Sequence, residues 1–144
     1  MGRLLYLGIA LACVAAAQDD PAGDKAAFQK VCGACHSTTM IADLKTEEEW
    51  ADTVANMSSV GAKGTEEEFS RVMRYLSRNF TTVNVNTASA EQIAPVLGIA
   101  VKAAQAVVDY RAAHGEFKTL VDLKKVPGLT ASGIAARQER IAFR

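Results

Sequence analysis

The feature that most constrains the fold is an internal repeat in the second half of the chain. Leu97–Lys102, with the sequence LGIAVK, is followed thirty positions later by Pro127–Ser132, with the sequence PGLTAS. In each copy, a glycine-led hairpin separates two stretches that have the signals of helices. The repeat therefore predicts that residues 81–144 form an all-α domain of two related units.

Local signals set the helices of this domain. Ser89 is a capping residue at the start of the first helix, and Pro95 must shorten or kink that helix. A longer helix is expected from Val101 to about Ala113 and ends at Gly115, since glycine commonly terminates helices. Thr119 is expected to cap the next helix.

The same domain resembles a known family. The opening NVNTA at Asn84–Ala88 and the run VVDYRAAHGEFKTLVDLKKVPGL at Val107–Leu129 resemble the tandem helix-hairpin-helix domain of the competence protein ComEA. The resemblance extends from Val83 to Phe143. It implies sequence-independent binding of double-stranded DNA outside the cytoplasm.

The resemblance implies that the hairpins bind DNA phosphates through backbone N–H groups, a helix end and a lysine. The candidate phosphate contacts are Gly98, Ala100, Lys102, Gly128 and Thr130.

Both hairpins depart from the Gly-hydrophobic-Gly pattern followed by lysine. Ala100 and Thr130 replace the second glycines, and Ser132 replaces the second lysine. A second glycine would allow close approach and unusual dihedrals, so a compact scaffold or a protein-docking domain is the alternative function.

The first half contains the stretch VCGACHST, in which Cys32, Cys35 and His36 lie within five positions. A disulfide, half of a zinc site, a thioredoxin-like redox pair and a haem attachment site all begin with such a pair. Zinc needs four ligands, and outside this motif only His114 offers another histidine or cysteine beyond the N-terminal segment. A thioredoxin-like motif needs a β-α-β surround, and a histidine after the second cysteine favours covalent haem c.

Residues 24–80 resemble small class I monohaem cytochromes c, with Trp50 and the pair Tyr75-Leu76 in family-like positions. In this interpretation Cys32 and Cys35 attach the haem and His36 is the proximal iron ligand.

The distal ligand of such a haem is predicted to be Met57, with Met40 and Met73 as alternatives. His/Met ligation suits electron transfer rather than catalysis, whereas an open sixth site would suit a haem enzyme or gas sensor.

Helix signals also dominate the first half. Thr46 with Glu49 and Thr65 with Glu68 are capping boxes, and residues 22–32 form a third helix. Three helices in some 60 residues enclose a small core, and a module with so small a core usually needs an additional stabilising group. Haem would be such a group.

The N-terminal segment predicts export. Leu4–Ala17 is an uninterrupted apolar run that is short for a membrane span, and we interpret residues 1–17 as a signal peptide cut near Ala17. An uncleaved anchor and lipidation at Cys13 are the alternatives. The mature chain is expected to lie in the periplasm, or otherwise outside the cytoplasm, without a transmembrane span.

Charge separates the two halves. Residues 18–80 hold seven Lys/Arg and eleven Asp/Glu, for a net charge of −4, and residues 81–144 hold eight and five, for +3. The chain is thus expected to join an acidic module to a mildly basic one through a short, polar joint that keeps them close.

Together these patterns predict an exported all-α protein that joins a three-helix cytochrome c domain, residues 18–80, to a helix-hairpin-helix domain, residues 81–144. The main hypothesis is an electron carrier, not an enzyme, that docks on a periplasmic or membrane redox protein. The alternative is a DNA-binding protein of the cell envelope in which the haem is a staple or redox sensor.

Overall fold

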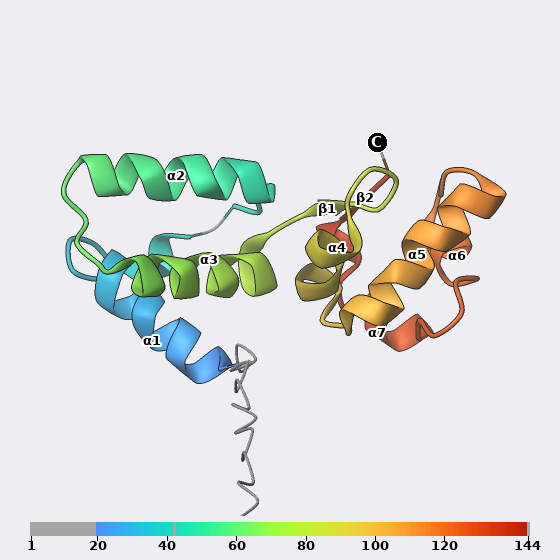
Figure 1. Ribbon diagram of the computed structural model, residues 1–144, viewed down its shortest axis with the longest axis horizontal. Coiled ribbons are helices and arrows are strands. Elements are labelled where there is room, and N and C mark those ends of the chain that lie inside the picture. The colour runs from blue at the N-terminus through green and yellow to red at the C-terminus, as the bar shows by residue number, and fades with distance from the viewer. Residues whose placement is uncertain (1–19, 42, 144) are drawn as a thin grey trace, which may run out of the picture.

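A computed structural model describes residues 20–41 and 43–143 (Figure 1). The predicted signal peptide, its cleavage site and Cys13 lie outside this part of the chain. Within it, no helix is long and apolar enough to cross a membrane. The elements, in chain order, are α1 (Pro21–Cys32), the 3-10 turn η1 (Thr38–Met40), α2 (Glu47–Ser59), α3 (Glu66–Phe80), β1 (Val83–Asn84), α4 (Ala90–Leu97), α5 (Val101–His114), α6 (Leu120–Leu123), α7 (Ala131–Ala135), the 3-10 turn η2 (Gln138–Arg140) and β2 (Ile141–Ala142).

The first module consists of α1, α2 and α3, in agreement with the three helices expected from the sequence. Both predicted capping boxes are confirmed, because Thr46 and Thr65 accept from the backbone N–H groups of Glu49 and Glu68. The core of the module is small, as its length requires. Its buried apolar side chains are Phe28, Val31, Trp50, Val72 and Leu76.

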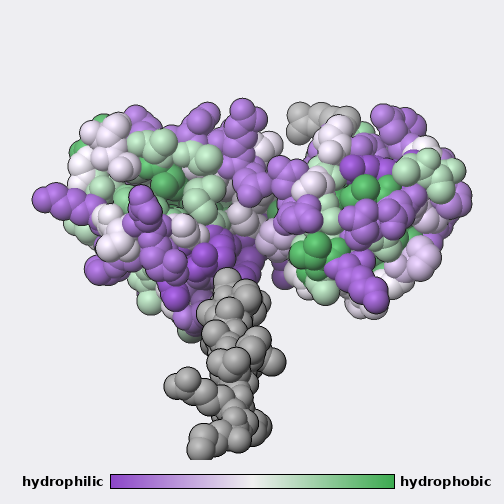
Figure 2. All heavy atoms as spheres, viewed as in Figure 1, coloured by the Kyte–Doolittle hydropathy of each residue, from purple (hydrophilic) through white to green (hydrophobic). Residues whose placement is uncertain are grey.

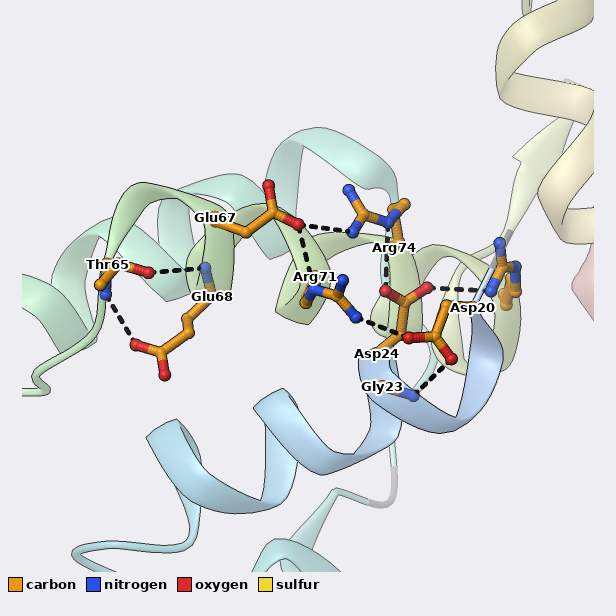
Figure 3. A network of polar contacts seen from close by, with 9 residues as sticks. Asp20, Gly23, Asp24, Thr65, Glu67, Glu68, Arg71 and Arg74 are labelled. Atoms are coloured by element: carbon orange, nitrogen blue, oxygen red, sulfur yellow. Dashed lines mark hydrogen bonds and ion pairs between the residues drawn. The ribbon is translucent and has the colours of Figure 1, made fainter. Parts of the chain in front are cut away.

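An acidic residue ties α1 to α3. The Asp24 carboxylate is 1% exposed and accepts from Arg74 Nε at 3.1 Å and from Arg78 Nη1 at 3.0 Å. Around it, the more exposed residues Asp20, Glu67 and Arg71 extend the network (Figure 3). A buried carboxylate needs such partners, so these contacts fix the register of α3 on α1.

The second module is formed by α4 to α7, and its helix ends agree with the sequence signals. Ser89 and Gln92 form a capping box, Gly115 follows α5, and Thr119 forms a capping box with Asp122. The helix that contains Pro95 has only eight residues. The buried core of this module is Val83, Val85, Ala88, Ala90, Ile93, Ala94, Val96, Leu97, Ala104, Val107, Phe117, Leu123, Val126 and Ile134.

Short backbone pairings join the modules and close the second one. No strand is evident in the sequence, yet β1 and β2 pair in parallel, with Val83 opposite Ile141. A parallel bridge also joins Lys45 to Thr81. These pairings span residues far apart in the chain, which explains why local patterns do not reveal them.

Arg140 completes this joint. Its side chain is 5% exposed and donates to backbone carbonyls at the end of α3: Nε to Thr81 at 2.8 Å and Nη2 to Ser77 at 2.6 Å. Nη1 donates to the carbonyl of Arg78. The expectation that the two modules lie close together is confirmed, and one cation caps the carbonyl end of α3.

Candidate nucleic-acid interface

The first hairpin begins where α4 ends. Gly98 has φ +65° and ψ +39°, in the left-handed region, and its N–H donates to the carbonyl of Ala94. A residue with a Cβ is strained there, so glycine is needed at this position. The chain then turns directly into α5.

Ala100, which replaces a glycine of the family pattern, occupies ordinary extended backbone with φ −65° and ψ +148°. The missing glycine therefore causes no strain. Ala100 is the N-cap of α5 and makes no side-chain cap hydrogen bond. Val101 and Lys102, the first residues of α5, are exposed. At the start of this helix, no cap side chain accepts a hydrogen bond from the backbone N–H groups, and a lysine lies nearby. This setting favours the binding of anions.

The second hairpin differs at the same place. Gly128 has φ +87°, but Thr130 is extended and its hydroxyl accepts from Gly133 N at 3.1 Å. This contact caps α7, which has only five residues. Because Thr130 already satisfies an N–H group that an anion could bind, the second hairpin is the weaker candidate.

The two hairpins are neighbours. Leu97 and Ile99 of the first hairpin and Leu129 and Thr130 of the second line one small cavity. The starts of α5 and α7 accordingly lie along the lower edge of the second module in Figure 1. The five candidate contacts of the sequence thus belong to adjacent turns of one surface.

Sequence reasoning missed Arg137, which lies between η2 and α7. Its Nη1 donates to the carbonyl of Val96 at 2.8 Å, 41 residues away in the chain. The guanidinium lies against Gly98 of the first hairpin. No local pattern could have indicated this contact.

The residues of the Cys-x-x-Cys-His motif lie in the first module, around an apolar cavity of about 450 Å³. Cys32, Cys35, His36 and Met57 line it together with Trp50. Figure 2 shows a group of apolar atoms on the surface of the first module. Both cysteines are free thiols, and burial raises the pKa of the Cys32 thiol above its ordinary value.

These side chains do not form a metal-binding cluster. Among the described residues, no group of three or more His, Cys, Asp or Glu side chains is placed to hold a metal ion. His36 is exposed, and its Nδ1 lies 3.3 Å from the carbonyl oxygen of Ser37. Of the two alternative ligands, Met40 is 73% exposed and Met73 packs against the core of the first module.

Comparison with known proteins defines the second module. Residues 78–142 match the helix-hairpin-helix motif family. This part of the chain is therefore a helix-hairpin-helix domain within a mostly helical protein.

Individual relatives agree. The chain is 38% identical over 47 residues to ComE operon protein 1 of Bacillus subtilis, covering 33% of this chain and 23% of that protein. It is 39% identical over 62 residues to an uncharacterized protein of Haemophilus influenzae, covering 42% and 55%.

A third relative is the endonuclease/exonuclease/phosphatase family domain-containing protein 1 of Danio rerio, 44% identical over 52 residues, covering 36% of this chain and 10% of that protein. The chain thus spans less than two thirds of the length of each of these three relatives. No solved structure matches the chain.

These findings correct the main functional hypothesis. The family match and the similarity to ComE operon protein 1 indicate a helix-hairpin-helix domain, and the described side chains form no metal cluster. The predictions of a covalent haem c and of a cytochrome that carries electrons are therefore wrong. The physical reason is that a five-residue motif is a local pattern compatible with several chemistries. Cys32, Cys35, His36 and Met57 are here lining residues of a cavity without an assigned ligand.

Proposed function

We propose that the second module binds duplex DNA independently of base sequence, through the sugar-phosphate backbone. The observation that carries this proposal is the start of α5, where an N-cap without a side-chain hydrogen bond lies between Gly98 and Lys102. The helix-hairpin-helix match and the similarity to ComE operon protein 1 support it.

The chemistry of the first hairpin suits a phosphate. N–H groups at a helix start and the positive end of the helix dipole attract anions, and a lysine adds a full charge. Contacts of this kind read no bases, since every nucleotide presents the same phosphate. The net charge of +3 in residues 81–144, against −4 in residues 18–80, favours the second module rather than the first as the part that faces DNA.

We further infer that the protein is a binding protein rather than an enzyme, and that it acts outside the cytoplasm. The apolar run Leu4–Ala17 supports export. Cell fractionation followed by N-terminal sequencing tests the location. A mature N-terminus near Ala17 in the extracytoplasmic fraction is expected, and an intact cytoplasmic chain would contradict it.

Fluorescence anisotropy of the full chain with two labelled duplexes of unrelated sequence tests DNA binding. Equal affinities are expected, with a linear fall of log K against log salt from about 50 to 200 mM. The Lys102→Ala variant should weaken binding about tenfold and reduce the salt slope by about 1. Lys118→Ala is the control, because Lys118 pairs with Glu116 at 2.9 Å and lies outside both hairpins. Absence of binding at the lowest salt would overturn the proposal.

A further inference from the structure

A cavity of about 570 Å³ lies beside the first hairpin, where the two modules meet. Gly98 and Ala100 of the hairpin line it, and so do Arg78 and Asn79 at the end of α3. The remaining charged lining residue is Arg137. Two arginines and the hairpin therefore line the same cavity.

The position of Arg137 depends on Gly98. A Cβ added at Gly98 would come within 2.8 Å of Arg137 Nη2 and 3.1 Å of Cζ. Such distances are below van der Waals contact, so the guanidinium lies directly against the hairpin backbone. Nη1 is held there by the carbonyl of Val96, at 2.8 Å. Gly98 therefore serves both the left-handed turn and the close approach of a cation.

The guanidinium of Arg137 uses only part of its hydrogen-bonding capacity within the described structure. Among the described residues, the Val96 carbonyl is the acceptor found for its guanidinium, and no carboxylate forms an ion pair with it. The residue is partly exposed. Arg140, in contrast, uses Nε, Nη1 and Nη2 on three backbone carbonyls. Arg137 thus keeps charge and donors available at the cavity.

We propose that Arg137 is a phosphate-binding residue of the first hairpin, where it holds a DNA backbone phosphate together with Lys102 and the start of α5. This inference rests on the proposed function. A guanidinium suits the task because its planar set of donors matches two oxygens of a phosphate. In the second repeat, Thr130 caps α7. Arg137, which follows α7, then contributes its positive charge to the first hairpin.

A purely structural role is the competing explanation, since Arg137 also caps a carbonyl at the end of α4. The salt dependence of DNA binding separates the two roles. Removing a phosphate contact reduces the number of counterions released, whereas removing a structural contact does not.

The test uses the full chain and the anisotropy assay with duplex DNA. Arg137→Gln should reduce affinity about tenfold and lower the salt slope by about 1. Arg111→Gln is the matched control, because Arg111 Nη1 also donates to a backbone carbonyl of this module, that of Val85 at 2.7 Å. Arg111 lies in the last turn of α5, at the end opposite the hairpin. Its variant should keep the slope of the unmodified chain.

Each outcome decides a separate point. Binding by the unmodified chain with an unchanged slope for Arg137→Gln would overturn this inference and leave the proposed function standing. Absence of binding by the unmodified chain would overturn both. If circular dichroism shows that Arg137→Gln does not fold, Arg137→Lys replaces it. That variant keeps the charge but loses the paired donors, so a several-fold loss of affinity at an unchanged slope is expected. Affinity equal to that of the unmodified chain would then contradict the inference.

Discussion

The Arg140 guanidinium and the carbonyl oxygen of Thr81, 59 residues apart in the chain, form a buried hydrogen bond of 2.8 Å. Thr81 directly follows α3 of the first module, and Arg140 closes the second module. Burial, with a smaller contribution from nearby Arg137, lowers the pKa of Arg140 to about 10. The module joint therefore depends on a cation whose burial is offset by backbone carbonyls.

Replacing Arg140 by Gln should loosen this joint. The variant leaves buried carbonyls without their charged donor, so we expect the free energy of unfolding to fall by about 3 kcal/mol. Urea unfolding followed by fluorescence reports on the first module, since Trp50 is the only tryptophan. Circular dichroism reports on both modules, and the two transitions should separate. Lys124→Gln, at an exposed residue, should change neither. Coincident, unshifted transitions in Arg140→Gln would contradict the role of this residue.

The buried Asp24 carboxylate should contribute more to the free energy of unfolding than the carboxylate of its exposed neighbour Glu67. Asp24→Asn removes the buried charge that accepts hydrogen bonds from the partly exposed Arg74 and Arg78, and we expect a loss of about 2 kcal/mol in the free energy of unfolding. Glu67→Gln removes an exposed partner of Arg71 and should cost about 0.5 kcal/mol. Urea unfolding of both variants measures the difference. Equal losses would show that burial does not set the strength of this network (Figure 3).

Asp122 makes the second module sensitive to acid. The Lys125 ammonium group at 2.8 Å, followed by the backbone N–H of Lys118, lowers the pKa of Asp122 from 3.8 to about 2. Because the folded-state pKa is lower than the unfolded one, this stabilisation is fully present above about pH 4 and disappears as pH falls through 2. A carboxylate titration by NMR should give a midpoint near 2, and Lys125→Gln should raise it. A midpoint near 3.8 in the unmodified chain would refute this.

The two hairpin glycines should differ when replaced by alanine. Both have positive φ, so each substitution should cost about 1 kcal/mol from backbone strain. Only at Gly98 would the new Cβ also meet the Arg137 guanidinium, whereas the Cβ position at Gly128 has no described atom within 4 Å. Thermal unfolding should therefore show a larger loss for Gly98→Ala than for Gly128→Ala. Equal losses would mean that Arg137 moves aside without cost.

Local signals predicted much of the architecture. Thr46, Thr65 and Ser89 each begin a helix as expected, because a capping side chain bonds within its own first turn. The internal repeat predicted the paired hairpins, and residues 78–142 match the helix-hairpin-helix motif. The same local reasoning misassigned the chemistry of Cys32, Cys35 and His36, since the side chains around a short motif decide what it can bind.

By itself, the sequence determined the helices, the tandem hairpins and the contrast in charge between the two halves, because these depend on residues a few positions apart. The contrast between the two hairpins is local as well, because alanine offers no capping acceptor at position 100, whereas Thr130 bonds within the first turn of its own helix. Only the tertiary structure placed Arg137 on Gly98 and Arg140 on the end of α3. Contacts across 39 and 59 residues exist only once the chain has packed, since no short-range pattern specifies them.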